Sequence, residues 1–334
     1  MMDRIDSWLR LCPDAAIDPL PGMRKAGLLD PVPDYATIAR LKAVLVERTG
    51  LLGIGSVWSG RHLVFRHFLG FGTAAQRAEW AARGLAVGIS EPDVGAHPKR
   101  LTTRADRTDT GFRITGRKAW VSNGPSADGI IVFAITSEVA GRKQYSAFIV
   151  PRDTPGLGIG EMPGLHALRP SQHCLLTLDN CPVPAAAMLG EAGSAYGRMA
   201  LPFRDIEDAV GSFGTLGALR HSISLFSGAT LPDQAADLGA IVALTAVFAA
   251  AAEPMVAALD AGRFRTGNAT LVGLRVLATD IVHRLRTLST GLHRDALIDM
   301  IADLEATLSV ARGPRMARQT YLGEAALHTA SRAE

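Results

Sequence analysis

The spacing of apolar residues changes twice along the chain. Up to residue 84 these residues recur every three or four positions, as at Ile38, Leu41 and Leu45, which is typical of amphipathic helices. Between residues 85 and 183 the spacing gives way to short β-branched and aromatic runs bounded by Gly, Pro, Asn and Asp. Such runs predict strands, and the candidates cover residues 128–136, 144–150 and 174–179.

Helical spacing returns from residue 194 onward. Apolar residues again step by three or four from Phe203 to Phe226 and from Leu297 to Leu308. The order of elements predicts an α+β multidomain chain. We expect an N-terminal helical domain at residues 1–84, a middle antiparallel β-domain at 85–193 and a C-terminal helical bundle at 194–334.

The longest apolar stretch runs from Leu238 to Ala252 and stops at Glu253 and Pro254. It is short for a bilayer span, so we interpret it as a buried helix. Residues 1–10 carry charges and no apolar run, unlike a signal peptide. The sequence therefore favours a soluble, cytoplasmic protein without a membrane span.

Composition favours a folded globular protein and gives no sign of nucleic-acid binding or of a metal site. The 334 residues are 48% hydrophobic, enough for a large folded core. Lys and Arg number 35 against 32 Asp and Glu, a balance too even to suggest a nucleic-acid partner. The three cysteines, Cys12, Cys174 and Cys181, are interpreted as reduced thiols, and their spacing predicts no metal site.

Two segments about 25 residues apart carry the clearest signal of chemistry. Residues 88–95, Gly-Ile-Ser-Glu-Pro-Asp-Val-Gly, and 120–124, Trp-Val-Ser-Asn-Gly, each end an apolar run with a hydroxyl and a turn. Backbone N–H groups, small hydroxyls and an aromatic face together suit a planar ligand ring. The alternative is two ordinary β-turns beside a buried Trp.

This pair of segments resembles the flavin-binding middle domain of the acyl-CoA dehydrogenase family. Further resemblance covers residues 20 to 225, and it is carried by residues 71–77 (Phe-Gly-Thr-Ala-Ala-Gln-Arg), 111–118, 148–157 and 178–191. The resemblance implies a helical domain, a β-domain and a helical bundle. It also implies FAD as cofactor, an acyl-CoA-type thioester as substrate, and an electron-transfer flavoprotein or similar acceptor.

The resemblance also places the cofactor contacts. Hydroxyls of two serines would meet the flavin ring, a tryptophan would pack on it, and backbone groups would line its pyrimidine edge or the pyrophosphate. These positions are Ser90, Ser122 and Trp120 for the side chains, and Val87, Ile89, Gly95 and Ala96 for the backbone. Ala96 stands where the family has a serine, which removes one phosphate contact.

Glu207 is the candidate catalytic base, because the isovaleryl-CoA and long-chain branches of the family carry their glutamate at this position. On a helix it shares a face with Gly211 and Gly214. A flat ligand near the backbone would explain these glycines, and close helix packing with an exposed Glu207 is the alternative. Asp303 is a second candidate through its distance from Arg294-Asp295-Ala296, although we interpret it as a solvated helix face.

The chain also departs from the family. Asp208 stands where an arginine follows the glutamate, and residues 227–232 lack the family's Arg and Phe-Gly pair. Two alternatives to an active dehydrogenase remain: a non-catalytic or half-site subunit that completes a flavin site with a related partner chain, and a flavin monooxygenase on the same scaffold. Apolar faces within residues 238–252 and 271–288 predict a homo-oligomer.

Overall fold

A computed structural model describes residues 1–11, 18–162, 167–227, 234–264, 269–290, 292 and 294–330. The chain forms two compact units. The helical unit comprises Met1–Ser56, Ala167–Arg169 and Asp205–Glu334, and the sheet unit comprises Val57–His166 and Pro170–Arg204. The helices at the two ends of the chain therefore share one unit. Helices α4 (Leu52–Phe68) and α6 (Leu201–Ser224) each run from one unit into the other.

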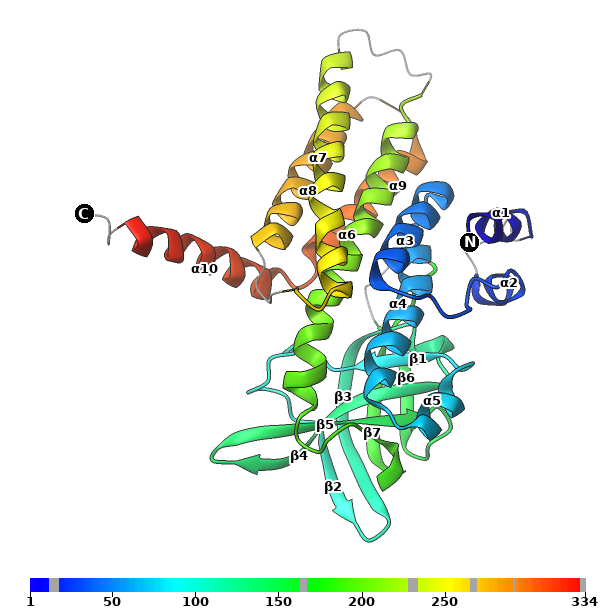
Figure 1. Cartoon of the computed structure of the whole chain (residues 1–334), viewed down its shortest axis with the longest axis vertical. Coiled ribbons are helices and arrows are strands. Elements are labelled where there is room, and N and C mark those ends of the chain that lie inside the picture. Colours follow the sequence, from blue (N-terminus) through cyan, green and yellow to red (C-terminus); the bar gives the residue numbers. More distant parts are fainter. Residues whose placement is uncertain are drawn as a thin grey trace. The chain divides into compact units, whose positions relative to one another are not determined.

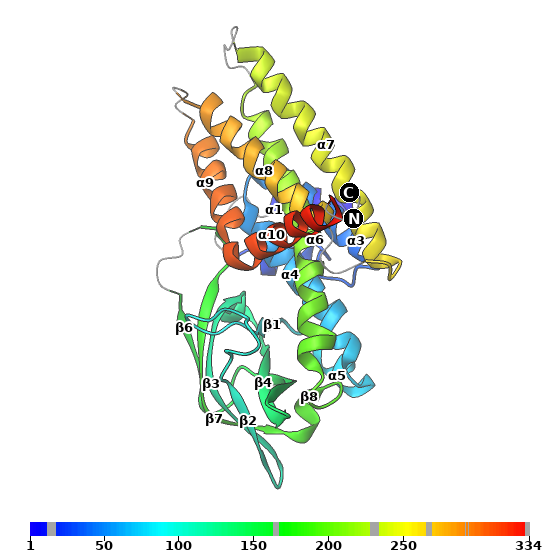
Figure 2. The ribbon, with the colours of Figure 1, turned by 90° about the vertical axis from the view of Figure 1, so that its left-hand side faces the viewer.

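The sheet unit is built on an eight-stranded mixed sheet of order β6-β7-β3-β2-β4-β5-β8, with β1 also paired to β4 (Figure 2). Its pairs are antiparallel except β1–β4 and β2–β4, which are parallel. The strands are β1 (Leu85–Gly88), β2 (Arg104–Thr108), β3 (Gly111–Ser122), β4 (Gly129–Val139), β5 (Arg142–Pro151), β6 (Leu157–Glu161), β7 (His173–Pro184) and β8 (Met188–Leu189). The predicted β-module is confirmed, with parallel pairing added at β4.

Alternation of apolar and polar residues puts one face of these strands into a core. Along β3, Phe112, Ile114 and Val121 are buried while Arg113 and Arg117 are exposed. The short helical segments of this unit are η1 (Leu69–Phe71), α5 (Ala74–Trp80), η2 (Gly124–Ser126), η3 (Ala185–Ala187) and the π-helix η4 (Tyr196–Ala200).

The segment at residues 71–77 has a structural reason for its residue types. Thr73 and Gln76 form a capping box at the start of α5: Thr73 Oγ1 accepts from Gln76 N, and Gln76 Oε1 accepts from Thr73 N at 2.8 Å. The Gln76 amide then donates to the carbonyls of Ala186 and Met188. One buried glutamine thereby starts the helix and fastens it to the chain around β8.

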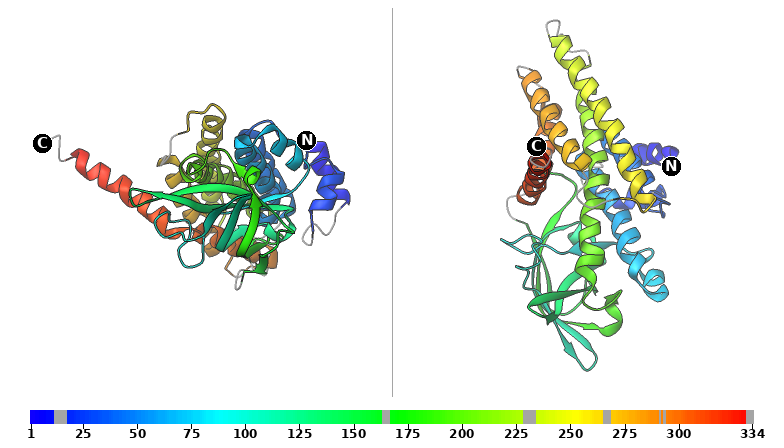
Figure 3. Two further views of the ribbon diagram at one scale, coloured as in Figure 1. Left: turned by 90° about the horizontal axis from the view of Figure 1, so that it is seen from below. Right: turned by 60° about the vertical axis from the view of Figure 1, so that its left-hand side comes forward.

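The helical unit places α6, α7, α8 and α9 side by side, with α7 against α8 and α8 against α9 (Figure 1). Helix α3 packs on α7, and α10 runs away from the bundle (Figure 3). The helices not yet given are α1 (Met2–Leu11), α2 (Leu20–Lys25), α3 (Tyr35–Thr49), α7 (Ala235–Asp260), α8 (Ala269–Leu288), α9 (Asp295–Ser309) and α10 (Arg312–Ala330).

Helix α7 differs from the prediction of a buried helix. It has 26 residues, and only 22% of its most apolar window, of mean hydropathy 1.9, is buried. Ile241 and Phe248 face the interior, whereas Val242 and Val247 are exposed. The sequence-based interpretation was wrong because the apolar stretch covers more than one face of the helix. By length and composition alone α7 could cross a membrane, but a single such helix among the described residues is weak evidence of a span.

Candidate functional site

The predicted cofactor residues lie on two segments: Val87, Ile89, Ser90, Gly95 and Ala96 lie in β1 or after it, and Trp120 and Ser122 lie at the end of β3. After β1 the backbone carbonyl of Ser90 accepts a hydrogen bond from Ala119 N at 2.9 Å, which draws residues 89–90 alongside β3. Ser90 is half-buried, and Trp120 follows Ala119 directly. The two sequence segments, 88–95 and 120–124, are therefore neighbours in the sheet unit.

Trp120 lies in a bulge. The β3–β7 register shifts between Lys118 and Val121, and Trp120 has a φ of 60°. This backbone conformation is uncommon for a bulky residue and turns the indole outward, so that 48% of Trp120 is exposed. Ser122, opposite His173 in β7, is exposed as well. The alternative of a buried Trp is excluded, and an exposed indole beside two serines fits a planar ring.

A buried ion pair that sequence reasoning missed holds this region together. Lys118 Nζ lies 3.0 Å from Glu91 Oε1 and donates to the carbonyl of Ile89 at 3.1 Å. The Glu91 carboxylate also accepts from the amides of Thr102 and Thr103 and from the Thr102 hydroxyl. The signal for it was a lysine inside the apolar run that leads to Trp120.

The pKa of Glu91 reflects these contacts. Burial alone would raise it, but the Lys118 charge and the hydrogen bonds from Thr103 and Thr102 lower the pKa of Glu91 to about 2. Glu91 is therefore a permanent carboxylate that joins β1 to β3 and to the segment around Thr102. Its role here is to position the loop that carries Ser90.

At two of the positions predicted to contact the cofactor through their backbone, Gly95 and Ala96, backbone groups already form hydrogen bonds within the protein. Gly95, at a φ of 59°, uses its N–H and its carbonyl in a tight turn with Glu91. The Ala96 carbonyl accepts from the Tyr196 hydroxyl at 2.6 Å. Val87 is half-buried in the middle of β1 and pairs with Ile131. The side chains of Ser90, Trp120 and Ser122 are thus better placed for a ligand than Gly95.

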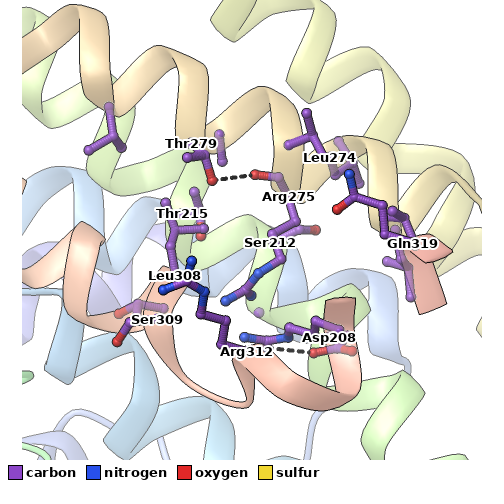
Figure 4. Close-up of a pocket in the computed structure, with 18 of the residues that line it drawn as sticks. Asp208, Ser212, Thr215, Leu274, Arg275, Thr279, Leu308, Ser309, Arg312 and Gln319 are labelled. Carbon is purple, nitrogen blue, oxygen red and sulfur yellow. Dashed lines mark hydrogen bonds and ion pairs between the residues drawn. The ribbon is translucent and has the colours of Figure 1, made fainter. Parts of the chain in front are cut away.

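Glu207 belongs to a cavity that lies wholly within the helical unit. This cavity has a volume of about 820 Å³ and is walled by α6, α8, α9 and α10 (Figure 4). Glu207 lines it from α6, and its side chain is accessible there rather than buried in the core. No described residue hydrogen-bonds the Glu207 carboxylate, and the volume lies within the range of small-molecule sites.

The surroundings of Glu207 favour a carboxyl that titrates near neutrality. Burial among the helices, and then the Asp208 carboxylate, raise the pKa of Glu207 to about 7, against the charges of Lys42 and Arg315. Water in the cavity weakens this effect, and a ligand that displaces the water strengthens it. Such a group accepts and releases a proton near neutral pH, as a general base must.

Lys42, on α3, is the buried cation near Glu207. Only 8% of it is exposed, and burial lowers its pKa to about 8 while Glu207 acts in the opposite direction. A Cβ on Gly214 would lie 2.7 Å from Lys42 Cε, so this glycine of α6 makes room for the lysine. No described residue hydrogen-bonds the Lys42 ammonium.

The glycines of α6 therefore have two different explanations. A Cβ on Gly217 would lie 2.3 Å from the Ala43 carbonyl oxygen, and one on Gly214 would meet Lys42, which is close helix packing. A Cβ on Gly211 would meet nothing within 4 Å, and Gly211 lines the cavity. Only Gly211 fits the interpretation of a ligand close to the backbone.

Asp208 is tied to two arginines of α10. Its carboxylate lies 2.9 Å from Arg315 and 3.1 Å from Arg318, and Arg318 also lies 2.9 Å from Asp205. The side chain of Asp208 is 19% exposed and that of Arg315 is 23% exposed. The arginine expected after the glutamate is absent, but α10 supplies positive charge to the same place.

Comparison with known proteins identifies the family. The acyl-CoA dehydrogenase middle domain matches residues 86–181. The 2-methylacyl-CoA dehydrogenase of Solanum tuberosum is 34% identical over 140 residues, which is 42% of this chain and 34% of that protein. The isovaleryl-CoA dehydrogenase of Oryza sativa subsp. japonica is 30% identical over 183 residues, 53% of this chain and 44% of that protein. Residues 86–181 therefore match the middle domain of the acyl-CoA dehydrogenase family, and the sequence similarity to these enzymes covers about half of the chain.

The likeness in fold extends beyond the matched sequence. The solved structure of butyryl-CoA dehydrogenase from Megasphaera elsdenii has a TM-score of 0.77, covering 98% of this chain and 97% of that one at 18% identity. By sequence, the chain matches less than half the length of the two curated relatives. The seven predicted cofactor residues fall inside the matched middle domain, and Glu207 lies outside it.

Asp303 is not the solvated residue that the sequence suggested. It is half-buried on α9, and its Oδ1 accepts a hydrogen bond from Leu168 N at 3.1 Å. Burial raises the pKa of Asp303 although this bond opposes it. The expectation was wrong because helical spacing does not show that residues 167–169 pack on α9.

Some sequence features lie outside the described residues. Cys12 and most of the 227–232 segment are among them. Cys174 and Cys181 are free and buried, and burial raises the pKa of both thiols. Within the described part of the chain, no cluster of His, Cys, Asp or Glu could hold a metal ion.

Proposed function

We propose that this protein is a flavin-dependent dehydrogenase that oxidises the α,β-carbon bond of an acyl-CoA-type thioester, with Glu207 as the base. The observation that carries the proposal is Glu207 itself: a carboxyl on the wall of an 820 Å³ cavity that no described residue hydrogen-bonds, with a pKa shifted upward. The curated relatives are acyl-CoA dehydrogenases, which supports this class of reaction.

The proposed role of Glu207 is to take the α-proton of the thioester onto a carboxylate oxygen. The proton-accepting form is the carboxylate, which the Lys42 charge favours at neutral pH. No described side chain hydrogen-bonds this carboxylate, so its lone pairs are available to the substrate. A base positioned in this way contributes on the order of 10²- to 10⁴-fold to the rate.

The residues of the sheet unit fit FAD. The exposed face of Trp120 and the hydroxyls of Ser90 and Ser122 would hold the isoalloxazine ring, and bound FAD would supply the hydride acceptor. The ion pair of Glu91 with Lys118, and the hydrogen bond from Lys118 to the Ile89 carbonyl, would hold the Ser90 loop in place. An electron-transfer flavoprotein or a similar carrier is the acceptor that we propose for the reduced cofactor.

We also propose that the protein acts as a homo-oligomer. Apolar side chains on three helices of the bundle remain at least 47% exposed in the single chain, and they are Val242 and Val247 of α7, Val276 of α8 and Ile298 of α9. Burial of these faces against another copy would remove them from water. Light scattering at micromolar concentration tests this, and a monomer mass would contradict it.

The experiment that tests the function begins with the visible spectrum of the purified protein, which reports bound flavin. Acyl thioesters are then added without oxygen, and bleaching of the flavin band is timed. Glu207→Gln should bind flavin normally and lose bleaching by about 10²-fold or more, because an amide cannot accept the α-proton.

Asp303→Asn is the matched control for that experiment. An asparagine Oδ1 still accepts from Leu168 N, so bleaching should be little changed. Loss of bleaching in this variant but not in Glu207→Gln would identify Asp303 on α9 as the base.

The same measurements distinguish the two alternative functions. A flavin band that no thioester bleaches would favour the half-site subunit that needs a partner chain. Reaction of the reduced flavin with oxygen to hydroxylate a substrate would favour a monooxygenase.

A further inference from the structure

Two guanidinium groups from the wall of the cavity donate to the same carbonyl oxygen. Arg275 Nη2 of α8 donates to the carbonyl of Val310 at 3.2 Å, and Arg315 Nη1 of α10 donates to the same oxygen. Val310 lies in the junction between α9 and α10. A neutral carbonyl accepts these bonds without cancelling either positive charge.

The two arginines differ in their counter-charges. Arg315 is paired with Asp208 at 2.9 Å, whereas no described carboxylate forms an ion pair with Arg275. Burial, and then the charge of Arg315, lower the pKa of Arg275 to about 10, although Asp208 opposes this. Arg275, which is half-buried, and Arg315 therefore place two positive charges close together.

A third arginine faces the same space. Figure 4 shows the side chains of Arg275 and Arg312 reaching into the cavity, the first from α8 and the second from the start of α10. Among the described residues Arg312 has no ion-pair partner. The other acidic residues on the wall, Asp280 and Glu305, are already paired with Arg284 and Arg286. Among the described residues, Arg275 and Arg312 therefore have no ion-pair partner, although the Asp208 carboxylate acts on Arg275 from a distance.

We propose that Arg275, Arg312 and Arg315 form a binding site for the anionic oxygen group, carboxylate or phosphate, of a ligand that occupies the cavity beside Glu207. Guanidinium groups suit this task because their fixed N–H donors match the oxygens of both anions. Hydroxyls of Ser212 and Thr279 lie on the same wall for the rest of the ligand. The proposed reaction would make this ligand the thioester substrate, but anion binding stands without it.

The full-length protein is titrated with inorganic phosphate and, separately, with glutarate as a simple dicarboxylate, at constant ionic strength set by chloride. Isothermal calorimetry measures the affinity for each anion. Arg275→Gln and Arg312→Gln should each weaken binding by about tenfold or more, since each removes a charge-assisted hydrogen bond. Tighter binding of phosphate would assign the site to a phosphoryl group, and tighter binding of glutarate to a carboxylate.

Arg40→Gln is the matched control, because it removes the same charge at an exposed ion pair with Glu253, and neither of these two residues lines the cavity. It should bind as the unmodified protein does. Arg312 is exposed, so its variant tests the site even if Arg275→Gln unfolds. Binding of neither anion above chloride, unchanged binding in Arg312→Gln, or an equal loss in Arg40→Gln would each overturn the proposal. Because the assay needs no turnover, it can succeed or fail independently of dehydrogenase activity.

Discussion

Each unit of the molecule contains a glutamate that faces a buried lysine, and the two pairs differ in their partners. Glu91 in the sheet unit touches Lys118 directly and accepts three further hydrogen bonds, which lower its pKa to about 2. Glu207 in the helical unit accepts no hydrogen bond from any described residue. The charge of Lys42 lowers its pKa only in part, and burial raises the pKa to about 7. The first carboxylate is fixed by its contacts, and the second is free to exchange a proton.

This difference separates a structural carboxylate from a reactive one. Direct contact and hydrogen bonds stabilise the charged form, so the group loses its value as a base near neutral pH. A cation that acts from a greater distance leaves the carboxylate ionised in part and accessible. Substitutions at the two pairs should therefore affect stability in one unit and chemistry in the other.

The largest expected effect on stability is at Glu91. Glu91→Gln leaves Lys118 buried without its counter-charge, and breaking a buried pair in this way costs about 3–5 kcal/mol. Urea unfolding measures the loss. Glu79→Gln, which removes the exposed partner of Arg83 on α5, should change stability by less than about 1 kcal/mol. Equal losses in the two variants would mean that the Glu91 pair contributes no more than a surface ion pair.

The Glu91 pair also predicts a pH dependence. Because the folded-state pKa of Glu91 lies below its ordinary value of 4.5, its stabilising contribution is present above that pH and is lost as pH falls toward 2. The difference in unfolding free energy between unmodified protein and Glu91→Gln should therefore shrink through this window. A difference that stays constant between pH 5 and pH 2 would contradict the low pKa.

The glycines of α6 give a smaller contrast along one helix. Gly217→Ala places a Cβ against the Ala43 carbonyl and should destabilise by about 1–3 kcal/mol. Gly211→Ala meets open space and should stabilise the helix by up to about 1 kcal/mol. Thermal unfolding compares the two. If both variants destabilise alike, the open space at Gly211 is not available to a side chain.

The sequence predicted the local elements well because apolar spacing and turn residues are local signals. Residues 144–150 and 174–179 lie in β5 and β7, and the segments around Ser90 and Trp120 meet as expected. The cofactor positions came from resemblance, since a bulge at Trp120 cannot be inferred from alternation. The glutamate at position 207 was likewise placed by the family and not by its helix pattern.

The features of the candidate site that the sequence did not predict depend on contacts between residues far apart in the chain. Lys42 is 165 positions before Glu207, and no local pattern connects them, so neither the lysine nor the raised pKa could be predicted. The α10 arginines that bind Asp208 lie 107 and 110 positions after it, so no local pattern connects them either. Asp303 was misinterpreted for the same reason, because its burial depends on residues 167–169 packing on α9.

The smallest expected effect concerns Lys42, the buried lysine near Glu207. Lys42→Met keeps the length of the side chain against Gly214 but removes the charge that lowers the pKa of Glu207. The pH at which flavin bleaching reaches half its maximum rate should then move upward by roughly one unit, because a less stabilised carboxylate ionises later. The maximum rate at high pH should change little. Arg40→Gln, which breaks an exposed ion pair of α3 with Glu253, should leave the profile in place. An unshifted profile in Lys42→Met would remove Lys42 from the proton chemistry and leave it as a packing residue between α3 and α6.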